Sequence, residues 1–167
     1  MHQRSIRVIV MGIGLLLGLA VNATAADDVL KFRSRHYQIV TDVDKKLAID
    51  IARHMDAVYG EYARRMKGFM TRSSIPMTLY VWRTYDKYLE FTQSMGFNAA
   101  NSGGVFFVTQ HGQGLATWIE GQSRHKMYYI LQHEGFHQFA YARIGRLPIW
   151  LNEGLAEYFG DALLVDQ

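Results

Sequence analysis

The chain of 167 residues contains no cysteine. This absence excludes a disulfide scaffold, a thiolate metal site, a cysteine nucleophile and a lipid-modified N-terminal cysteine. A long apolar run is also missing, because the stretch from Val8 to Val21 falls short of the roughly 20 residues that a membrane-spanning helix needs. We find no internal repeat and no low-complexity linker after it. The sequence is therefore that of a globular chain without a disulfide framework.

The N-terminus has the layout of a secretory signal peptide. Arg4 and Arg7 precede the short apolar run, and Ala23-Thr24-Ala25 offers a small-x-small cleavage pattern. We expect residues 1–25 to be removed and residues 26–167 to be exported, either to a bacterial periplasm or to the medium. No stable membrane span would remain after cleavage. An uncleaved N-terminal anchor is the alternative.

An excess of charge of one sign is lacking as well. The full chain has 18 Lys+Arg against 15 Asp+Glu, and removal of Arg4 and Arg7 leaves a balance of 16 − 15 = +1. The basic character thus belongs largely to the targeting segment, and we expect no nucleic-acid partner. An exported chain without cysteine must be held together by its hydrophobic core, by a metal, or by both.

Hydrophobic periodicity predicts an α+β fold, with a small mixed β-sheet, a long N-terminal helix and two C-terminal helices that stand together. Thr41 is expected to cap the long helix, with Asp44 as the acid of a capping box. Strands are expected at residues 36–40, 76–82, 105–109 and 115–119, the last two as a hairpin. Helices are expected at residues 41–68, 84–95, 123–144 and 148–159.

One motif carries chemistry: residues 133–137 read His-Glu-Gly-Phe-His, an H-E-x-x-H pattern within a predicted helix. Residues four apart lie one turn apart on the same helix face, so His133 and His137 can bind one ion. Glu134 is rotated by about 100° from His133. Its carboxylate can therefore take a proton from a zinc-bound water. Two satisfied polar histidines in a buried helix are the structural alternative.

A third ligand is available downstream. Glu153 and Glu157 are also four apart, on a helix that the turn at residues 145–148 can fold back beside the first. Glu153 can complete a zinc site, and Glu157 can accept the free ring N–H of a zinc-binding histidine. Asn152 can hydrogen-bond backbone or substrate, and Gly154 can allow close helix approach.

These two segments resemble the gluzincin metallopeptidases of the MA clan, and more narrowly the small bacterial peptidase MA-like domains. The residues that carry the resemblance are His133-Glu134-x-x-His137 and Trp150-Leu-Asn-Glu-Gly-Leu-Ala-Glu157. The resemblance implies a zincin-like domain over residues 26–167 that holds one Zn²⁺ per chain through His133, His137 and Glu153. It implies Glu134 as general base and Glu157 as a residue that supports a ligand. The implied activity is zinc-dependent hydrolysis of a peptide or protein substrate.

The resemblance also implies that an edge strand before the metal helix pairs with substrate, expected here at Leu115–Ile119, with Trp118 near the substrate. An ordinary packed aromatic is the alternative for Trp118. Larger gluzincins place an oxyanion-stabilising Tyr or His farther downstream, whereas this chain ends eight residues after Phe159. One interpretation is therefore a domain truncated at its C-terminus. Other candidates for the oxyanion role are His111, His125, Tyr128, Tyr129 and Tyr158.

Two other functions compete with the peptidase. A non-catalytic zinc domain on the same scaffold, used for binding or assembly, would lack a transition-state donor. Glu134 favours the enzyme, because a purely structural zinc site needs no base and is more often closed by a fourth protein ligand. A carbohydrate or cell-wall binder would use the 10 Tyr, 9 Phe and 3 Trp, but those aromatics fall mostly at core-like positions.

Overall fold

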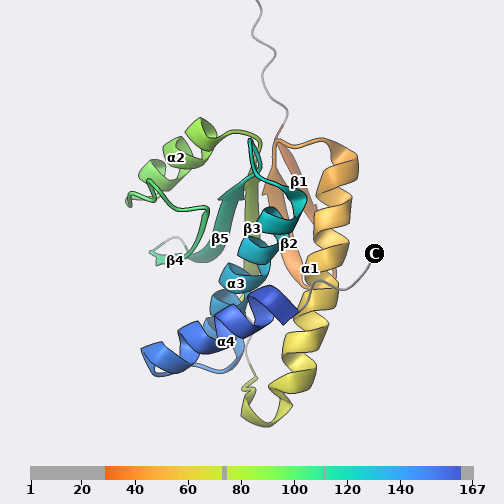
Figure 1. The fold of residues 1–167 in the computed structure, drawn as a ribbon, viewed down its shortest axis with the longest axis vertical. Helices are drawn as coiled ribbons and strands as arrows, with labels where there is room; N and C mark the ends of the chain where they lie inside the picture. The colour runs from red at the N-terminus through yellow and green to blue at the C-terminus, as the bar shows by residue number, and fades with distance from the viewer. Residues whose placement is uncertain (1–28, 73–74, 111, 163–167) are drawn as a thin grey trace, which may run out of the picture.

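Five strands pair into one mixed sheet in the order β1-β2-β3-β5-β4 (Figure 1). This computed structural model describes residues 29–72, 75–110 and 112–162, so the predicted signal peptide lies outside the described residues. The inner strands β2, β3 and β5 are parallel, and β1 and β4 run antiparallel to their neighbours. The elements are β1 (Leu30–Arg33), β2 (Tyr37–Thr41), α1 (Lys45–Arg65), the 3-10 helix η1 (Lys67–Phe69), β3 (Met77–Trp82), α2 (Tyr85–Ser94), β4 (Gly104–Thr109), β5 (Gly112–Trp118), α3 (Arg124–Arg143) and α4 (Ile149–Ala162).

The α+β prediction is confirmed at the level of a mixed sheet with helices packed on it. Strand β1 was not predicted as a separate strand. The start of α1 was predicted wrongly, because Thr41 ends β2 and its hydroxyl donates to the Val81 carbonyl at 2.6 Å. Asp44 is itself the N-cap of α1 and accepts from the Leu47 N–H at 3.0 Å. Among the described residues, no helix is both long enough and apolar enough to cross a bilayer.

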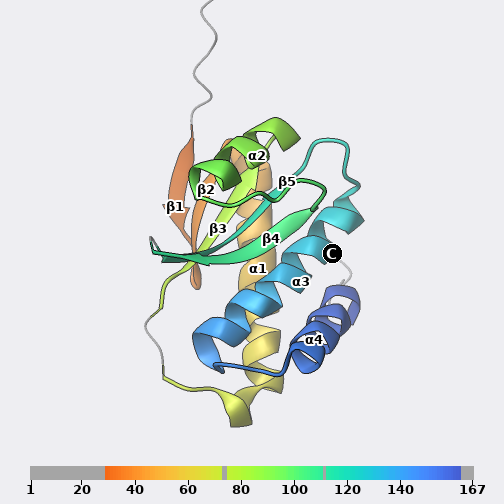
Figure 2. The ribbon, with the colours of Figure 1, turned by 90° about the vertical axis from the view of Figure 1, so that its left-hand side faces the viewer.

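Each face of the sheet is covered by different helices (Figure 2). Strand β3 alternates as predicted: Leu79 and Val81 are buried on the side of α1 and α3, whereas Tyr80 faces the α2 side. Because α2 covers one face while α1 and α3 cover the other, the inner strand β5 is buried along most of its length.

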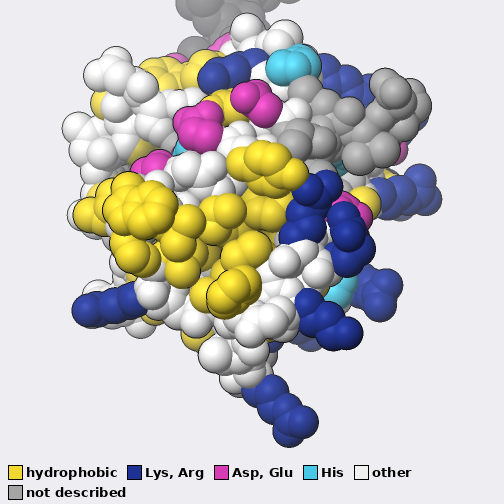
Figure 3. All heavy atoms as spheres, turned by 60° about the horizontal axis from the view of Figure 1, so that its bottom comes forward, with side chains coloured by type: hydrophobic (Ala, Val, Ile, Leu, Met, Phe, Trp, Pro, Cys, Tyr) yellow, Lys and Arg dark blue, Asp and Glu magenta, His cyan; other side chains and the backbone are white. Residues whose placement is uncertain are grey.

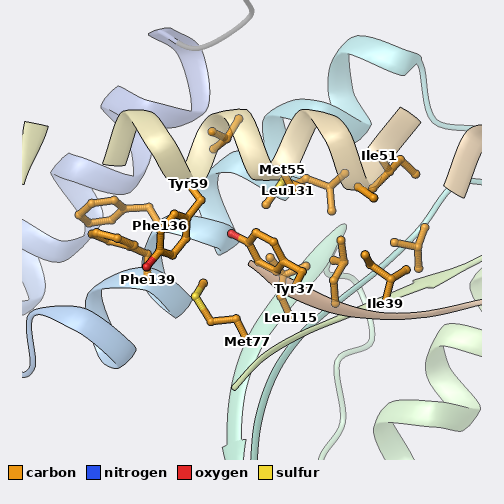
Figure 4. Packing of buried hydrophobic residues seen from close by; sticks show 14 of the residues in the cluster. Tyr37, Ile39, Ile51, Met55, Tyr59, Met77, Leu115, Leu131, Phe136 and Phe139 are labelled. Carbon is orange, nitrogen blue, oxygen red and sulfur yellow. The ribbon is translucent and has the colours of Figure 1, made fainter. Parts of the chain in front are cut away.

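The main core lies between the sheet and the helices α1, α3 and α4 (Figure 4). Tyr62 of α1 packs edge-on against Phe136 of α3 and Phe159 of α4, with ring centroids 5.5 and 4.9 Å apart. A Cβ at Gly135 would lie 2.8 Å from the Met55 methyl group and 3.3 Å from the Tyr62 hydroxyl, so a larger residue there would have to displace side chains of α1. This packing fixes α3, the helix that carries the H-E-x-x-H motif, between the sheet and α4.

The predicted identity of the edge strand is wrong. Strand β5, which includes Leu115 and Trp118, pairs with β3 on one side and β4 on the other, so it is an inner strand. The edge on this side of the sheet belongs to β4 (Gly104–Thr109), and β1 forms the opposite edge. Two neighbouring apolar runs predict a hairpin, but nothing in their pattern says which strand joins the rest of the sheet.

Candidate metal centre

The two histidines of the motif converge on α3. Ser123 caps this helix by accepting from the Lys126 N–H at 3.1 Å, and the helix continues unbroken through the motif. The Nε2 atoms of His133 and His137 lie 3.2 Å apart, with the ring planes at 83° to each other. Both Nε2 atoms therefore point at one position beside the helix.

Helix α4 folds back along α3 and brings Glu153 to this position. Gly145 ends α3 with φ 104°, a conformation that glycine adopts without strain, and the turn leads into α4 at Ile149. The Glu153 Oε2 atom lies 3.8 Å from His133 Nε2 and 3.6 Å from His137 Nε2. One ligand atom from each of the three residues lies within 4.8 Å of the others.

The close crossing of α3 and α4 depends on Gly160, not on Gly154. A Cβ at Gly160 would lie 2.9 Å from the Tyr129 ring and 3.5 Å from the His133 Cβ. A Cβ at Gly154 would meet nothing within 4 Å, so the predicted role of Gly154 in close helix approach is wrong. The sequence offered two glycines on one helix, and only the side of α4 that faces α3 distinguishes them.

The donor set suits zinc. Two imidazole nitrogens and one carboxylate oxygen are ligands that Zn²⁺ takes in catalytic sites, which keep a fourth position open. Burial lowers the pKa of His133 below its usual value and His137 lowers it further, partly opposed by Glu157 and Glu153, which favours the neutral imidazole that binds metals. Within the described part of the chain, the Nδ1 atoms of both histidines are buried without a hydrogen-bond partner.

Glu134 lies on the next side of α3 and contacts the edge strand. Its Oε2 atom accepts a hydrogen bond from the Phe106 backbone N–H at 2.8 Å. Burial raises the pKa of this carboxyl above the usual range of a glutamate, partly opposed by the bond from Phe106. A carboxylate with a raised pKa is a better proton acceptor near neutral pH. The arrangement thus holds a base between the histidine pair and strand β4.

Glu157 lies one turn beyond Glu153 and faces the other nitrogen of His133. Its Oε1 atom is 3.6 Å from His133 Nδ1, and its Oε2 atom accepts from the Tyr129 hydroxyl at 2.6 Å. That hydrogen bond raises the pKa of Tyr129 to about 12. Glu157 therefore lies where a carboxylate can orient the His133 ring through its Nδ1.

Two cavities flank the histidine pair. One, of about 230 Å³, is lined by Ser102, Gly103, Gly104, Lys126, Tyr129, Ile130, His133, Glu134 and Glu157. The other, of about 270 Å³, is lined by Phe106, His137, Ala140, Tyr141, Gly145, Arg146, Leu147 and Asn152. Residues of β4 or the loop before it line both, so an extended chain along the free edge of β4 would have room on each side of the three donors.

The structure brings some predicted site residues to this centre and leaves others away from it. Asn152 lines the cavity that contains His137, and its Oδ1 atom is buried with no hydrogen-bond partner in the described ranges. Trp118 does not join the group: it packs against Tyr85 on the α2 side of the sheet, and its indole donates to the Ser102 carbonyl at 3.2 Å. Its separation from Leu115 by three positions places it on the opposite sheet face.

The predicted candidates for an oxyanion donor also lie partly at the centre and partly away from it. Tyr129 is the one whose hydroxyl lies beside the histidine pair. Tyr128 is buried against His54, and Tyr158 accepts a hydrogen bond from Arg65 at the end of α1. His125 is exposed in the first turn of α3, and His111 lies outside the described residues.

Sequence reasoning missed three features of the centre. The contact of the Phe106 backbone N–H with Glu134 could not be predicted, because every residue except proline has a backbone N–H and no residue type marks this one. Gly103 and Gly104 lie so close to Ile130 that a Cβ on either would come within 2.6 Å of that side chain. Lys126 lies 4.6 Å from the centroid of the Tyr129 ring at the rim of the first cavity. Its i, i+3 spacing to Tyr129 could have signalled that contact.

Neither a scan against protein-family models nor a search of curated proteins finds a match to this chain. The resemblance to gluzincins therefore depends on the residues of the two motifs, and the function must be argued from the geometry of the centre.

Proposed function

We propose that this chain is a zinc-dependent peptidase of the gluzincin kind on a zincin-like scaffold, exported from a bacterial cell. The observation that carries the proposal is the convergence of three donor atoms, from His133, His137 and Glu153, within 4.8 Å of one another. The second support is Glu134, a carboxylate with a raised pKa that lies beside them and needs no place among the ligands.

His133, His137 and Glu153 would hold one Zn²⁺. When bound, the ion lowers the pKa of a water in its open position and polarises the carbonyl of a substrate. Glu134 accepts the proton of the attacking water and then passes it to the leaving amine. Glu157, whose Oε1 atom lies 3.6 Å from His133 Nδ1, would orient the His133 ring by accepting a hydrogen bond from Nδ1 once the metal is bound, and the Tyr129 hydroxyl holds the Glu157 carboxylate in place.

The free edge of β4 favours a peptide as substrate. An unpaired strand edge presents backbone donors and acceptors that an extended peptide can pair with. Phe106 lies in the middle of that edge, and its N–H points toward Glu134 rather than toward β5. A peptide lying along β4 would therefore pass the proton acceptor and the three donors.

A non-catalytic zinc domain for binding or assembly is the second candidate. Of the predicted oxyanion donors within the described ranges, Tyr129 is the one that lies beside the histidines. Its hydroxyl already donates a hydrogen bond to Glu157, which favours the non-catalytic domain because that hydroxyl is not free to stabilise an oxyanion. The two functions share the metal and differ in turnover.

Metal analysis and a peptide digest test the proposal together. We expect purified protein supplied with zinc to hold about one ion per chain. It should cleave members of a broad peptide library, and this cleavage should stop when a chelator removes the ion. Glu134→Gln should keep the zinc and lose the cleavage, because an amide cannot accept the proton. Absence of zinc after reconstitution would contradict the metal centre. If the parent and the variant both bind zinc and neither cleaves any peptide, the non-catalytic binding domain becomes the better proposal.

A further inference from the structure

The two cavities beside the histidine pair carry opposite charge. The cavity of about 230 Å³, which we call the His133 cavity, is lined by two glutamates and one lysine. The cavity of about 270 Å³, which we call the His137 cavity, has Arg146 as the one Lys, Arg, Asp or Glu among its described lining residues. A negative group of a ligand is therefore disfavoured in the His133 cavity and favoured in the His137 cavity.

The exposed acids of α4 do not offset the charge of the His137 cavity. Glu153 faces both histidine Nε2 atoms, where a bound Zn²⁺ would offset its charge, and Glu157 accepts from the Tyr129 hydroxyl. Asp161 lies one turn farther along α4. In the view of Figure 3, acidic side chains gather on one side of a broad hydrophobic group. Arg146 precedes α4, at the opposite end of that helix from Asp161.

Arg146 is available to a ligand. Among the described residues, none forms an ion pair or a side-chain hydrogen bond with it, and its side chain is exposed where it lines the His137 cavity. Arg64 and Arg65, by contrast, both pair with Glu61. A guanidinium offers N–H donors in a planar fork that matches the two oxygens of a carboxylate. The group that Arg146 suits best is therefore a carboxylate.

Asn152 and the start of α4 add to the polar side of the His137 cavity. The Asn152 Oδ1 atom is buried and has no hydrogen-bond partner in the described ranges, so the backbone N–H of a bound peptide would satisfy it. Helix α4 begins at Ile149 with no acidic residue in its first turn, and Leu147 and Asn152 on either side of this start both line the cavity. The positive end of the helix dipole therefore also favours a negative ligand group.

The rest of the His137 cavity is apolar and small. The rings of Phe106 and Tyr141 pack together with centroids 5.6 Å apart, and Ala140 and Leu147 complete these walls. A volume of about 270 Å³ lies below the range of about 300–1,000 Å³ that drug-sized ligands occupy, so the cavity suits one side chain of a larger ligand. A glutamate side chain combines an aliphatic stem for the apolar walls with a terminal carboxylate for Arg146.

The order of the two cavities along β4 decides which part of a peptide would enter each. Gly104, at the start of β4, lines the His133 cavity, and Phe106 lines the His137 cavity. Antiparallel pairs outnumber parallel ones, and β4 pairs with β5 in that way. A peptide antiparallel to β4 would pass the His137 cavity first and the His133 cavity second. A side chain in the His137 cavity then belongs to the N-terminal side of the cleaved bond.

We propose that the His137 cavity is a pocket for a glutamate side chain of the substrate, on the N-terminal side of the cleaved bond, and that Arg146 determines this specificity. Arg146 binds the glutamate carboxylate, and Asn152 accepts a backbone N–H of the same peptide. The role of the pocket in selecting a cleaved bond rests on the proposed peptidase function. Binding of the glutamate does not require turnover, so the two can be tested separately.

Peptide binding tests the pocket on the full chain. The zinc-supplied Glu134→Gln protein, which should hold peptides without cutting them, is titrated with alanine heptapeptides that carry Glu, Gln or Lys at the centre. Acetylated and amidated ends make the central side chain the only charge. We expect the Glu peptide to bind about tenfold more tightly than the Gln peptide, because a hydrogen bond between charged groups is stronger than one between neutral groups. Added salt should reduce the difference.

Charge reversal at Arg146 separates specificity from a structural effect. In the Glu134→Gln background, Arg146→Glu should bind the Lys peptide more tightly than the Glu peptide, an inversion that lost packing would not produce. Arg53→Glu is the matched control, because Arg53 is exposed on α1 and lines neither cavity. This control should keep the preference for Glu. Thermal melts and zinc content of each variant establish that the fold and the metal are kept.

Four results would overturn the pocket. The first is no binding of the Glu peptide, and the second is equal binding of the Glu and Gln peptides. The third is a preference for Glu that Arg146→Glu leaves as strong as Arg53→Glu does. The fourth is tighter binding of an all-alanine peptide with a free C-terminus than of the blocked Glu peptide, which would assign Arg146 to the end of a chain.

Failure of the peptidase proposal would look different. Selective binding of the Glu peptide, with no cleavage of any peptide by the parent, would keep the pocket and contradict the enzyme. Cleavage by the parent that occurs equally after Glu and after Gln would keep the enzyme and contradict the pocket.

Discussion

Glu153 and Glu157 are the same residue type, one turn apart on one helix, but their contacts differ and so do the roles proposed for them. The Glu153 carboxylate faces both Nε2 atoms, at 3.6 and 3.8 Å, whereas the Glu157 carboxylate faces His133 Nδ1 and the Tyr129 hydroxyl. A ligand to a metal and a residue that orients a ligand should respond differently to loss of charge.

We therefore expect Glu153→Gln to weaken zinc binding strongly, because an uncharged amide is a poorer ligand. Glu157→Gln should reduce zinc affinity or turnover by about 10–100-fold, the range for groups that support a ligand. Competition with a chromogenic chelator measures the affinity of each variant. If Glu157→Gln loses the ion while Glu153→Gln keeps it, the ligand assignment is wrong by one turn.

At the scale of the helices, the metal centre depends on how closely α3 and α4 pack. The contact is closest at Gly160, where the backbone of α4 lies against Tyr129 and His133. Both helices were predicted from capping residues and periodicity, and Ser123 and Gly145 do bound α3 as expected. Which glycine faces α3 could not be predicted, because periodicity fixes a helix without fixing its rotation against a neighbour.

Gly160→Ala should lower the free energy of unfolding and weaken zinc binding, because the added methyl group must displace the Tyr129 ring or separate the helices. The cost of such overpacking is typically about 1–3 kcal/mol. Gly154→Ala is the matched control: its methyl group meets nothing, so it should be neutral or should stabilise α4 by up to about 1 kcal/mol. Denaturant titrations with and without zinc measure both effects. Equal effects at the two positions would contradict a close crossing at Gly160.

At the scale of the whole molecule, the sequence predicted the α+β composition but left the order of strands open. Period-2 patterns located β3 and the β4–β5 hairpin, since alternate burial is a local property. The position of β4 at the free edge depends on which strand pairs with β3, and no short-range pattern records that choice. The same limit explains why Phe106 was missed and why Trp118 was expected near the substrate.

The packing of α1 against α3 also makes stability depend on pH. His54 is buried against the Tyr128 ring, with centroids 4.2 Å apart, and burial together with nearby Arg124 lowers its pKa to about 4. In the unfolded chain the value is near 6.5, so between pH 6.5 and about 4 the unfolded state binds a proton that the folded state does not. The free energy of unfolding therefore falls as the pH falls through this window.

This contribution amounts to at most about 3 kcal/mol by pH 4, from about 1.4 kcal/mol per pKa unit. His54→Leu removes the titrating group and keeps a buried apolar side chain, so it should flatten the loss of stability below pH 6.5. Urea unfolding of parent and variant at several pH values measures it. Parallel curves for the two proteins between pH 6.5 and 4 would contradict a buried neutral His54.

The hydrogen bond between Phe106 and Glu134 also bears on how the molecule avoids aggregation. A bare strand edge is a template onto which the strands of other molecules can add, and natural proteins protect such edges with charge. Here a glutamate carboxylate occupies a donor in the middle of β4, so a second copy that extended the sheet would have to displace it. A peptide that paired with β4, as proposed for the substrate, would face the same obstacle unless the carboxylate had a water to bind instead. The residue proposed to move the proton would thereby also keep molecules of this protein from joining edge to edge.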